Sequence, residues 1–180
     1  MVVEQGYLPL PLEDLAKRIG ISKALIYRYY PTQVDLFDAL LELLFQDLDL
    51  ENLSRLSETG EVEMATIACA ETYFDHVCQY GPALYILSSD LYFLARLDPV
   101  RLRDRARLMA KLARRLRVRF GLNARDSLAA LRMFAAIAEE GGAMTFRDPN
   151  RRAIARRTLS ELIQGAMKGL SQFQSDSGVG

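Results

Sequence analysis

The chain has 180 residues, which is enough for one large domain or for a small domain joined to a larger one. Half of the residues are hydrophobic, and 23 basic side chains balance 23 acidic ones. No apolar run is long enough to span a membrane, and the N-terminus lacks the basic and apolar pattern of a secretory signal. We therefore expect a cytoplasmic protein that does not enter the membrane.

Two short helices separated by a glycine are predicted near the N-terminus. Pro11 can occupy the first turn of a helix over 12–19, and Gly20 can end that helix in a left-handed turn. Ser22 is a good N-cap for a second helix over 23–30. This order is typical of a helix-turn-helix. We expect its small core to consist of Leu15, Ile19, Ile21, Leu25 and Ile26.

A long helix is predicted next. Pro31 ends the second helix, and Thr32 with Asp35 forms an approximate capping box for a helix that continues to about Leu48. Its apolar face contains Phe37, Leu40, Leu41, Leu44 and Leu48. We place the end of a helix-turn-helix DNA-binding domain, residues 1–48, at this point, and expect the polar stretch 49–60 to be a loop.

Helical periodicity continues through the rest of the chain, and strand signals are almost absent. We predict an all-α protein whose second domain, residues 49–180, is a helical effector-binding and dimerisation domain. The segment 83–97 is rich in Tyr, Leu and Phe, and the tail from Ser171 is expected to fray. The predicted helices of this domain are about 63–80, 98–120, 123–145 and 150–170.

The last two predicted helices are apolar enough to suggest a subunit interface. Between Ser127 and Ala138 only Arg132 is charged, and a helix that is apolar nearly all round must be covered on several sides. Gly165 and Gly169 would allow close approach of a second backbone. The alternative is that both helices only complete the core of the monomer. The predicted interface residues are Leu131, Ala135, Ala138, Leu159, Leu162, Ala166 and Leu170.

The second helix of a helix-turn-helix enters the major groove of DNA. Here Lys23 and Ala24 would face base edges, and Arg28 would reach a base or a phosphate. The hydroxyls of Tyr27 and Tyr29 would donate to phosphates. The alternative interpretation is an ordinary helical pair with a solvated charged face. The full predicted DNA-binding set is Ser22, Lys23, Ala24, Tyr27, Arg28, Tyr29 and Gln33.

The segment from about Gly6 to Leu44 resembles the TetR family of bacterial transcription regulators. The residues that carry the resemblance are Leu15-Ala16, Gly20-Ile21-Ser22, Tyr27, Tyr29-Tyr30, Thr32-Gln33 and Leu36. The resemblance implies a homodimeric regulator, in most cases a repressor, that binds a palindromic operator in double-stranded DNA. It further implies a small-molecule effector pocket among the C-terminal helices and a dimer interface made by a four-helix bundle.

The sequence departs from the family pattern at several positions. Only five residues precede Gly6, where the family has a whole helix, and Pro11, Glu13 and Gln33 replace residues that favour phosphate contact. Residues 1–50 carry a net charge of −4. One explanation is a start codon upstream of Met1. The other is that the protein is a dimeric small-molecule-binding or interaction module of the same fold that has lost operator binding.

A ligand pocket is predicted among aromatic and apolar side chains, which suit a hydrophobic or aromatic effector. Each of these side chains could equally belong to the core. The basic run 101–119 has nine basic residues and one acidic residue, and we interpret it as a solvated face that pairs with acidic neighbours in preference to a patch for an anionic partner. The predicted pocket residues are Glu71, Phe74, Tyr85, Tyr92, Met109 and Phe134.

Catalysis and metal binding have little support in the sequence. The chain has one histidine, His76, and two cysteines, Cys69 and Cys78, whose separation does not suit a metal site. No phosphate-binding glycine loop or nucleophile motif is present. We therefore expect a non-enzymatic protein without a cofactor, with two buried thiols.

Overall fold

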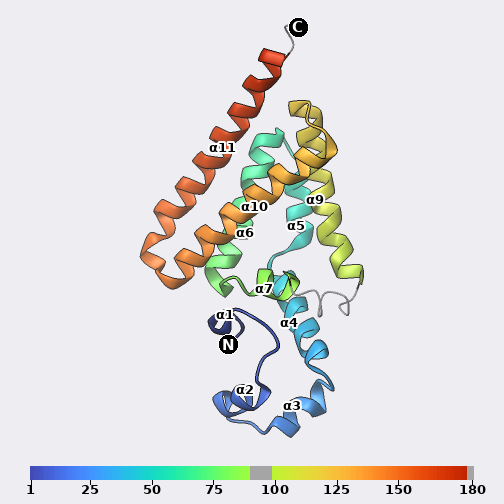
Figure 1. Cartoon of the computed structure of the whole chain (residues 1–180), viewed down its shortest axis with the longest axis vertical. Helices are drawn as coiled ribbons and strands as arrows, with labels where there is room; N and C mark the ends of the chain where they lie inside the picture. Colours follow the sequence, from blue (N-terminus) through green and yellow to red (C-terminus); the bar gives the residue numbers. More distant parts are fainter. Residues whose placement is uncertain (90–98, 178–180) are drawn as a thin grey trace.

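The computed structural model describes residues 1–89 and 99–177, and within these ranges every regular element is a helix. The all-α prediction is confirmed. Figure 1 shows a small N-terminal unit at one end of the molecule and a bundle of longer helices above it. The elements are α1 (Val2–Gln5), α2 (Leu12–Ile19), α3 (Lys23–Tyr29), α4 (Gln33–Asp47), α5 (Leu50–Glu58), α6 (Val62–Tyr80), α7 (Ala83–Ser89), α9 (Pro99–Phe120), α10 (Ala124–Arg147), the 3₁₀ turn Pro149–Arg151 and α11 (Arg152–Ser177).

Helices α2 and α3 form the predicted helix-turn-helix. Gly20 adopts φ 75°, a left-handed conformation that costs a glycine little, and it ends α2 as expected. The Ser22 hydroxyl accepts a hydrogen bond of 3.2 Å from the backbone N–H of Leu25 and caps α3. These two local interactions fix where the chain turns between the helices.

The core of this unit is smaller than the sequence suggests. Leu12, Ala16 and Ile26 are buried, with Leu15 and Leu36 packed against them. The prediction was wrong for Ile19 and Ile21, whose side chains are 55% and 37% exposed. The reason is that both residues flank the Gly20 turn, which points them away from the contact between α2 and α3.

Helix α4 connects the small unit to the bundle (Figure 1). Thr32 and Asp35 form the predicted capping box at its N-terminus, with the Thr32 N–H donating to the Asp35 carboxylate at 2.8 Å. Phe37, Leu41 and Leu44 are nearly fully buried in the main core. Since Leu36 belongs to the small core, α4 holds the two parts of the protein together.

The stretch after α4 is a helix, and the predicted loop over 49–60 is therefore wrong. The Asp49 carboxylate accepts from the backbone N–H of Asn52 and caps α5. Leu53 and Ser57 are buried four residues apart on one face of this helix. Packing against α6 and α9 outweighs the polar composition on which the loop prediction rested.

Helix α6 lies at the centre of the bundle and packs most extensively on α10, with α5, α11 and α9 also against it. Phe74 and Val77 are completely buried at this centre. Opposite them, a Cβ added to Gly142 of α10 would lie 2.6 Å from the Val77 Cβ. The two helices therefore approach each other at a point where only glycine fits.

Ion pairs fasten the outer helices to this centre. On α11, Arg156 bonds both Glu71 and Asp75 of α6, at 2.8 and 2.5 Å, and Arg152 bonds Asp75 at 3.0 Å. The Ser160 hydroxyl donates to Glu71. Among the helices that the structure describes, none is long and apolar enough to cross a membrane.

One face of the basic run on α9 pairs as predicted. Lys111 lies 2.5 Å from Glu58, and Arg119 lies 3.0 Å from Glu63. Between them, Arg115 donates to the backbone carbonyls of Ser57 and Gly60. These three cations recur every fourth residue, so they share one face of the helix, which fastens α9 to α5 and to the start of α6.

Candidate functional site

The first candidate surface is the exposed side of α3, at the end of the molecule farthest from the bundle (Figure 1). Lys23, Ala24, Tyr27, Arg28 and Tyr29 are all exposed, and Tyr29 is 70% accessible. Ser22 is also exposed, but its hydroxyl is already engaged in capping α3. The tertiary structure thus leaves the predicted reading residues free of the core and presents them together.

The charges on this surface are largely compensated. The Lys23 ammonium lies 3.0 Å from the Glu13 carboxylate of α2, and this hydrogen bond lowers the pKa of Glu13 and raises the pKa of Lys23. Arg18 pairs with Glu4, which lowers the pKa of Glu4 to about 2. Within the described residues, Arg28 has no ion-pair partner. Arg28 is therefore the cation of α3 most available to a phosphate or a base.

Gln33 differs from the other predicted DNA-binding residues. Its Nε2 donates to the Leu10 carbonyl at 2.9 Å, and its Oε1 accepts from the Leu10 N–H at 3.2 Å. The side chain is half-buried. Its amide holds the segment before α2 against the start of α4, and contact of Gln33 with DNA stays a prediction. The sequence could not indicate this pairing because the partner is a backbone group 23 residues away.

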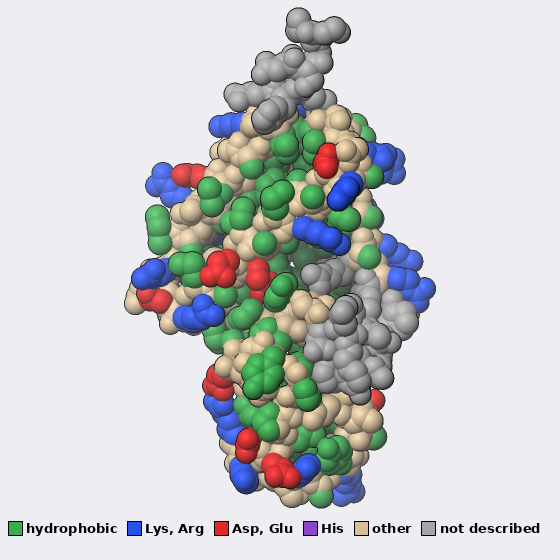
Figure 2. All heavy atoms as spheres, in the orientation of Figure 1, with side chains coloured by type: hydrophobic (Ala, Val, Ile, Leu, Met, Phe, Trp, Pro, Cys, Tyr) green, Lys and Arg blue, Asp and Glu red, His purple; other side chains and the backbone are tan. Residues whose placement is uncertain are grey.

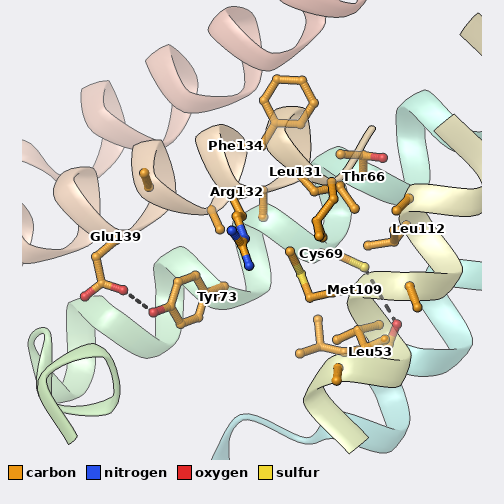
Figure 3. A pocket seen from close by; sticks show the side chains of 18 of the residues that line it. Leu53, Thr66, Cys69, Tyr73, Met109, Leu112, Leu131, Arg132, Phe134 and Glu139 are labelled. Atoms are coloured by element: carbon orange, nitrogen blue, oxygen red, sulfur yellow. Dashed lines mark hydrogen bonds between the residues drawn. The ribbon is translucent and has the colours of Figure 1, made fainter. Parts of the chain in front are cut away.

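The second candidate site is a cavity of about 1530 Å³ in the bundle, between α5, α6, α9 and α10 (Figure 3). Of the predicted pocket residues, Tyr85, Met109 and Phe134 line it. Glu71 and Phe74 do not, because Glu71 pairs with Arg156 on another face of α6 and Phe74 is fully buried in the core. Tyr92 lies outside the described residues.

Several lining residues were missed as pocket candidates. The Tyr73 hydroxyl donates to the Glu139 carboxylate across the gap between α6 and α10 (Figure 3). The Cys69 thiol donates to the Leu53 carbonyl at 3.7 Å, and burial raises its pKa to about 11, so it stays protonated. Arg132 also lines the cavity. Its position as the single charged residue between Ser127 and Ala138 is a signal in the sequence that could have identified it.

A polar cluster connects the end of α4 to α6. The buried His76 ring places Nδ1 3.3 Å from the Asp47 carboxylate, and Tyr80 donates to the other oxygen of Asp47 at 2.9 Å. The His76 ring lies between those of Tyr73 and Tyr80. Because Asp47 is the last residue of α4, this cluster fixes the end of the helix that carries the helix-turn-helix.

His76 should make the stability of the protein depend on pH. Burial lowers its pKa below the ordinary 6.5, and the opposing attraction of Asp47 does not restore it. The unfolded chain then binds a proton more readily than the folded one, so stability falls as the pH drops through 6.5. We expect His76→Gln to reduce the loss of thermal stability between about pH 7.5 and about pH 5.5, measured by circular dichroism. Equal losses in both proteins would contradict the assignment.

The third candidate surface is the outer face of α10 and α11. Figure 2 shows hydrophobic side chains over the region that these two helices cover in Figure 1. Met133, Ile154 and Leu162 are 61%, 63% and 52% exposed, and Met144 is 41% exposed. On α11, Gly165 has no atom within 4 Å of the position of an added Cβ. Large apolar side chains and small residues therefore share one uncovered face.

The predicted interface residues divide between this face and the core. Leu162 and Ala166 are exposed on it, whereas Ala135 and Leu170 are half-buried. Leu131, Ala138 and Leu159 are buried within the protomer, and for them the prediction is corrected. The reason is that α11 is apolar on two faces: Leu159, Ile163 and Met167 turn inward, and the sequence period does not say which face another chain would cover.

Comparisons with known proteins agree with the geometry of the N-terminal unit. Residues 1–40 match the family of bacterial regulatory proteins called the tetR family. The nucleoid occlusion factor SlmA of Haemophilus ducreyi is 42% identical over 45 residues, which is 25% of this chain and 22% of that protein. SlmA of Mannheimia succiniciproducens is 34% identical over 64 residues, 36% of this chain and 28% of that protein. The chain thus matches less than a third of the length of these relatives.

Proposed function

We propose, from the premise that residues 1–40 form a TetR-family DNA-binding domain, that this protein is a dimeric, ligand-responsive transcriptional regulator, most simply a repressor. The observation that carries the proposal is the capped helix-turn-helix whose second helix presents Lys23, Tyr27 and Arg28 outward. That helix is joined to the bundle through α4. Reading, connecting and sensing elements are therefore distinct parts of one chain.

DNA recognition would use α3 in the major groove. Arg28 would supply a guanidinium that has no ion-pair partner among the described residues, and the exposed Tyr27 and Tyr29 would donate their hydroxyls to phosphates. Lys23 must first exchange its Glu13 partner for DNA, which lowers the gain from that contact. The α3 surface would therefore offer specific side chains to the DNA bases while attracting the phosphate backbone only weakly.

Dimerisation would use the outer face of α10 and α11. Solvent-exposed Met133, Ile154 and Leu162 bury apolar surface when a second copy of the same face covers them. Gly165 and Ala166 let two α11 helices approach closely. A twofold-symmetric pair of α3 helices then reads a palindromic operator, since operator symmetry mirrors protein symmetry.

The effector would act through α4. The cavity is lined by Leu48, Leu50 and Leu53, which follow directly on α4, and the Asp47–His76 contact ties the end of α4 to α6. A ligand that fits the cavity better at one position of α4 shifts the spacing of the two readers. It does so only by its differential affinity for the two spacings.

The DNA-binding proposal is tested with fragments that the wild-type dimer selects from random double-stranded DNA. Arg28→Ala is expected to weaken binding about tenfold and to reduce the dependence of affinity on salt by about one ion, because one guanidinium contact is lost. Glu13→Gln is expected to strengthen binding severalfold, because it frees Lys23 and removes a carboxylate near the phosphates. Both effects are measured by fluorescence anisotropy over a range of salt concentrations.

The DNA affinities of these two variants are compared with that of a control variant. Arg125→Gln, an exposed change on α10 far along the chain from the reader, is the control and should leave DNA affinity unchanged. An unchanged affinity in Arg28→Ala would rule out the assigned reading surface. The second candidate function, an interaction module of the same fold without operator binding, is favoured by the Glu13–Lys23 pair. It becomes the better description if the wild-type protein selects no DNA at all.

A further inference from the structure

We infer that the cavity takes an amphipathic anion: a molecule with an apolar body and a carboxylate or phosphate head held by Arg132 at the cavity wall. This inference rests on the proposed function of the cavity as the effector site and adds the chemistry of its ligand. Among the described residues three arginines line the cavity, Arg132 from α10 and Arg114 and Arg117 from α9. Figure 3 shows the Arg132 side chain extending from α10 toward the apolar lining.

The basic side chains of α9 fall into two groups, those that bind other helices and those that line the cavity. On one face of α9, three cationic side chains bind groups of α5 and α6, as described above: Lys111, Arg115 and Arg119. Arg114 and Arg117 belong to the lining of the cavity, and in the described part of the chain neither has a partner. The structural role of this helix therefore accounts for one face of the basic run and leaves the face toward the cavity unexplained.

Arg132 differs from the other two in its sequence context, and like them it is exposed to solvent. It is the single charged residue between Ser127 and Ala138, on a helix whose neighbouring positions are apolar. No described residue forms an ion pair or hydrogen bond with it. A guanidinium on the wall of an apolar cavity, where it can present several N–H groups in a plane, suits a carboxylate or phosphate oxygen.

The acidic side chains of the lining do not reverse this preference. One oxygen of the Glu139 carboxylate accepts a hydrogen bond from Tyr73, which fixes its position but leaves its charge. With Glu140, the described part of the lining contains two carboxylates against three guanidinium groups. The apolar part of the wall, which includes Leu112, Leu131 and Phe134, is available to the body of the ligand. An anionic head with an apolar tail satisfies both parts of the lining.

The test measures binding of four ten-carbon probes to the full-length protein by isothermal titration calorimetry, each below its micelle-forming concentration. Decanoate and decyl phosphate share an anionic head, decanol has a neutral head, and decyltrimethylammonium a cationic one. Decanoate, decyl phosphate or both should bind about tenfold or more tightly than decanol, and the cation should bind weakest. Which anion binds better distinguishes a carboxylate effector from a phosphate effector.

Variants test whether Arg132 causes the preference for an anionic head group. Arg132→Gln should reduce decanoate and decyl phosphate affinity to that of decanol and leave decanol binding unchanged, whereas Arg132→Lys should keep part of the preference. Arg147→Gln is the matched control, because Arg147 is exposed on the same helix and does not line the cavity. Thermal melting checks that each variant folds.

The outcomes separate the two claims. If decanol binds as tightly as the anions, or if Arg132→Gln leaves anion affinity unchanged, the inference about the anion is overturned while the cavity remains an apolar binding site. If none of the four probes binds, both the inference and the proposed effector role of the cavity fail.

Discussion

Leu162→Glu should convert the proposed dimer into a monomer and weaken its binding to selected DNA by about a hundredfold or more. The side chain is 52% exposed at the middle of the outer face of α11, so a carboxylate there is harmless in a protomer. In a twofold interface the same change places two like charges near each other in an apolar contact, which is costly. Loss of the second reader removes the gain from simultaneous binding of two half-sites, which is about 10² to 10⁴ in affinity.

Val118→Glu is the matched control for this experiment. Val118 is 76% exposed on α9 and lies outside the face of α10 and α11. We expect it to leave both the mass measured by sedimentation velocity and the affinity for selected DNA unchanged. A Leu162→Glu protein that sediments as the wild type does would show that the outer face of α11 is not the dimer interface.

Gly142→Ala should destabilise the fold, because overpacking between α6 and α10 costs about 1–3 kcal/mol and the helix propensity gained by replacing glycine offsets only about 1 kcal/mol of it. The added methyl group would lie 2.6 Å from the Val77 Cβ and 3.1 Å from the Phe74 carbonyl oxygen, and neither is the end of a flexible side chain. The helices must therefore move apart at the centre of the core. For a chain of this size, the expected fall in melting temperature is several degrees, about 2–4 °C for each kcal/mol.

Gly141→Ala, one residue earlier, separates packing from helix propensity. A Cβ at Gly141 meets Phe74 ring atoms at 3.4 and 3.5 Å, which is an ordinary van der Waals distance. Both substitutions gain the same helix propensity, about 1 kcal/mol, from replacing a mid-helix glycine. Gly141→Ala should therefore melt at or above the wild-type temperature. Equal melting temperatures for the two variants would mean that α6 and α10 do not approach closely at Gly142.

Much of the helix-turn-helix could be predicted because its signals are local. Gly20, Ser22 and the Thr32–Asp35 capping box each act within three or four residues, and all three occur as expected. Reliance on local signals made the prediction for residues 49–60 wrong, because the polar composition of that segment suggested a loop. There the decisive contribution came from packing on α6 and α9, which bury one side of α5, and α9 lies about 40 residues further along the sequence.

The candidate sites were predicted less completely for a related reason. Periodicity identifies an apolar face but not what covers it, so Leu159 and Leu162 looked alike although only Leu162 is exposed. Residue type alone likewise cannot say that Glu71 pairs with Arg156 while Glu139 lines the cavity. These assignments depend on contacts between helices that are 60 or more residues apart, such as Tyr73 with Glu139.

By itself, the sequence determined the all-α class, most helix boundaries and the DNA-reading unit, because capping, turn formation and helical periodicity are satisfied between near neighbours. Only the tertiary structure decided which charged side chains have an ion-pair partner and which do not. It pairs Lys23 with Glu13, binds Gln33 to Leu10, and leaves Arg28 and Arg132 without partners among the described residues. Ion pairing depends on how separate helices pack, and that packing is a property of the whole chain.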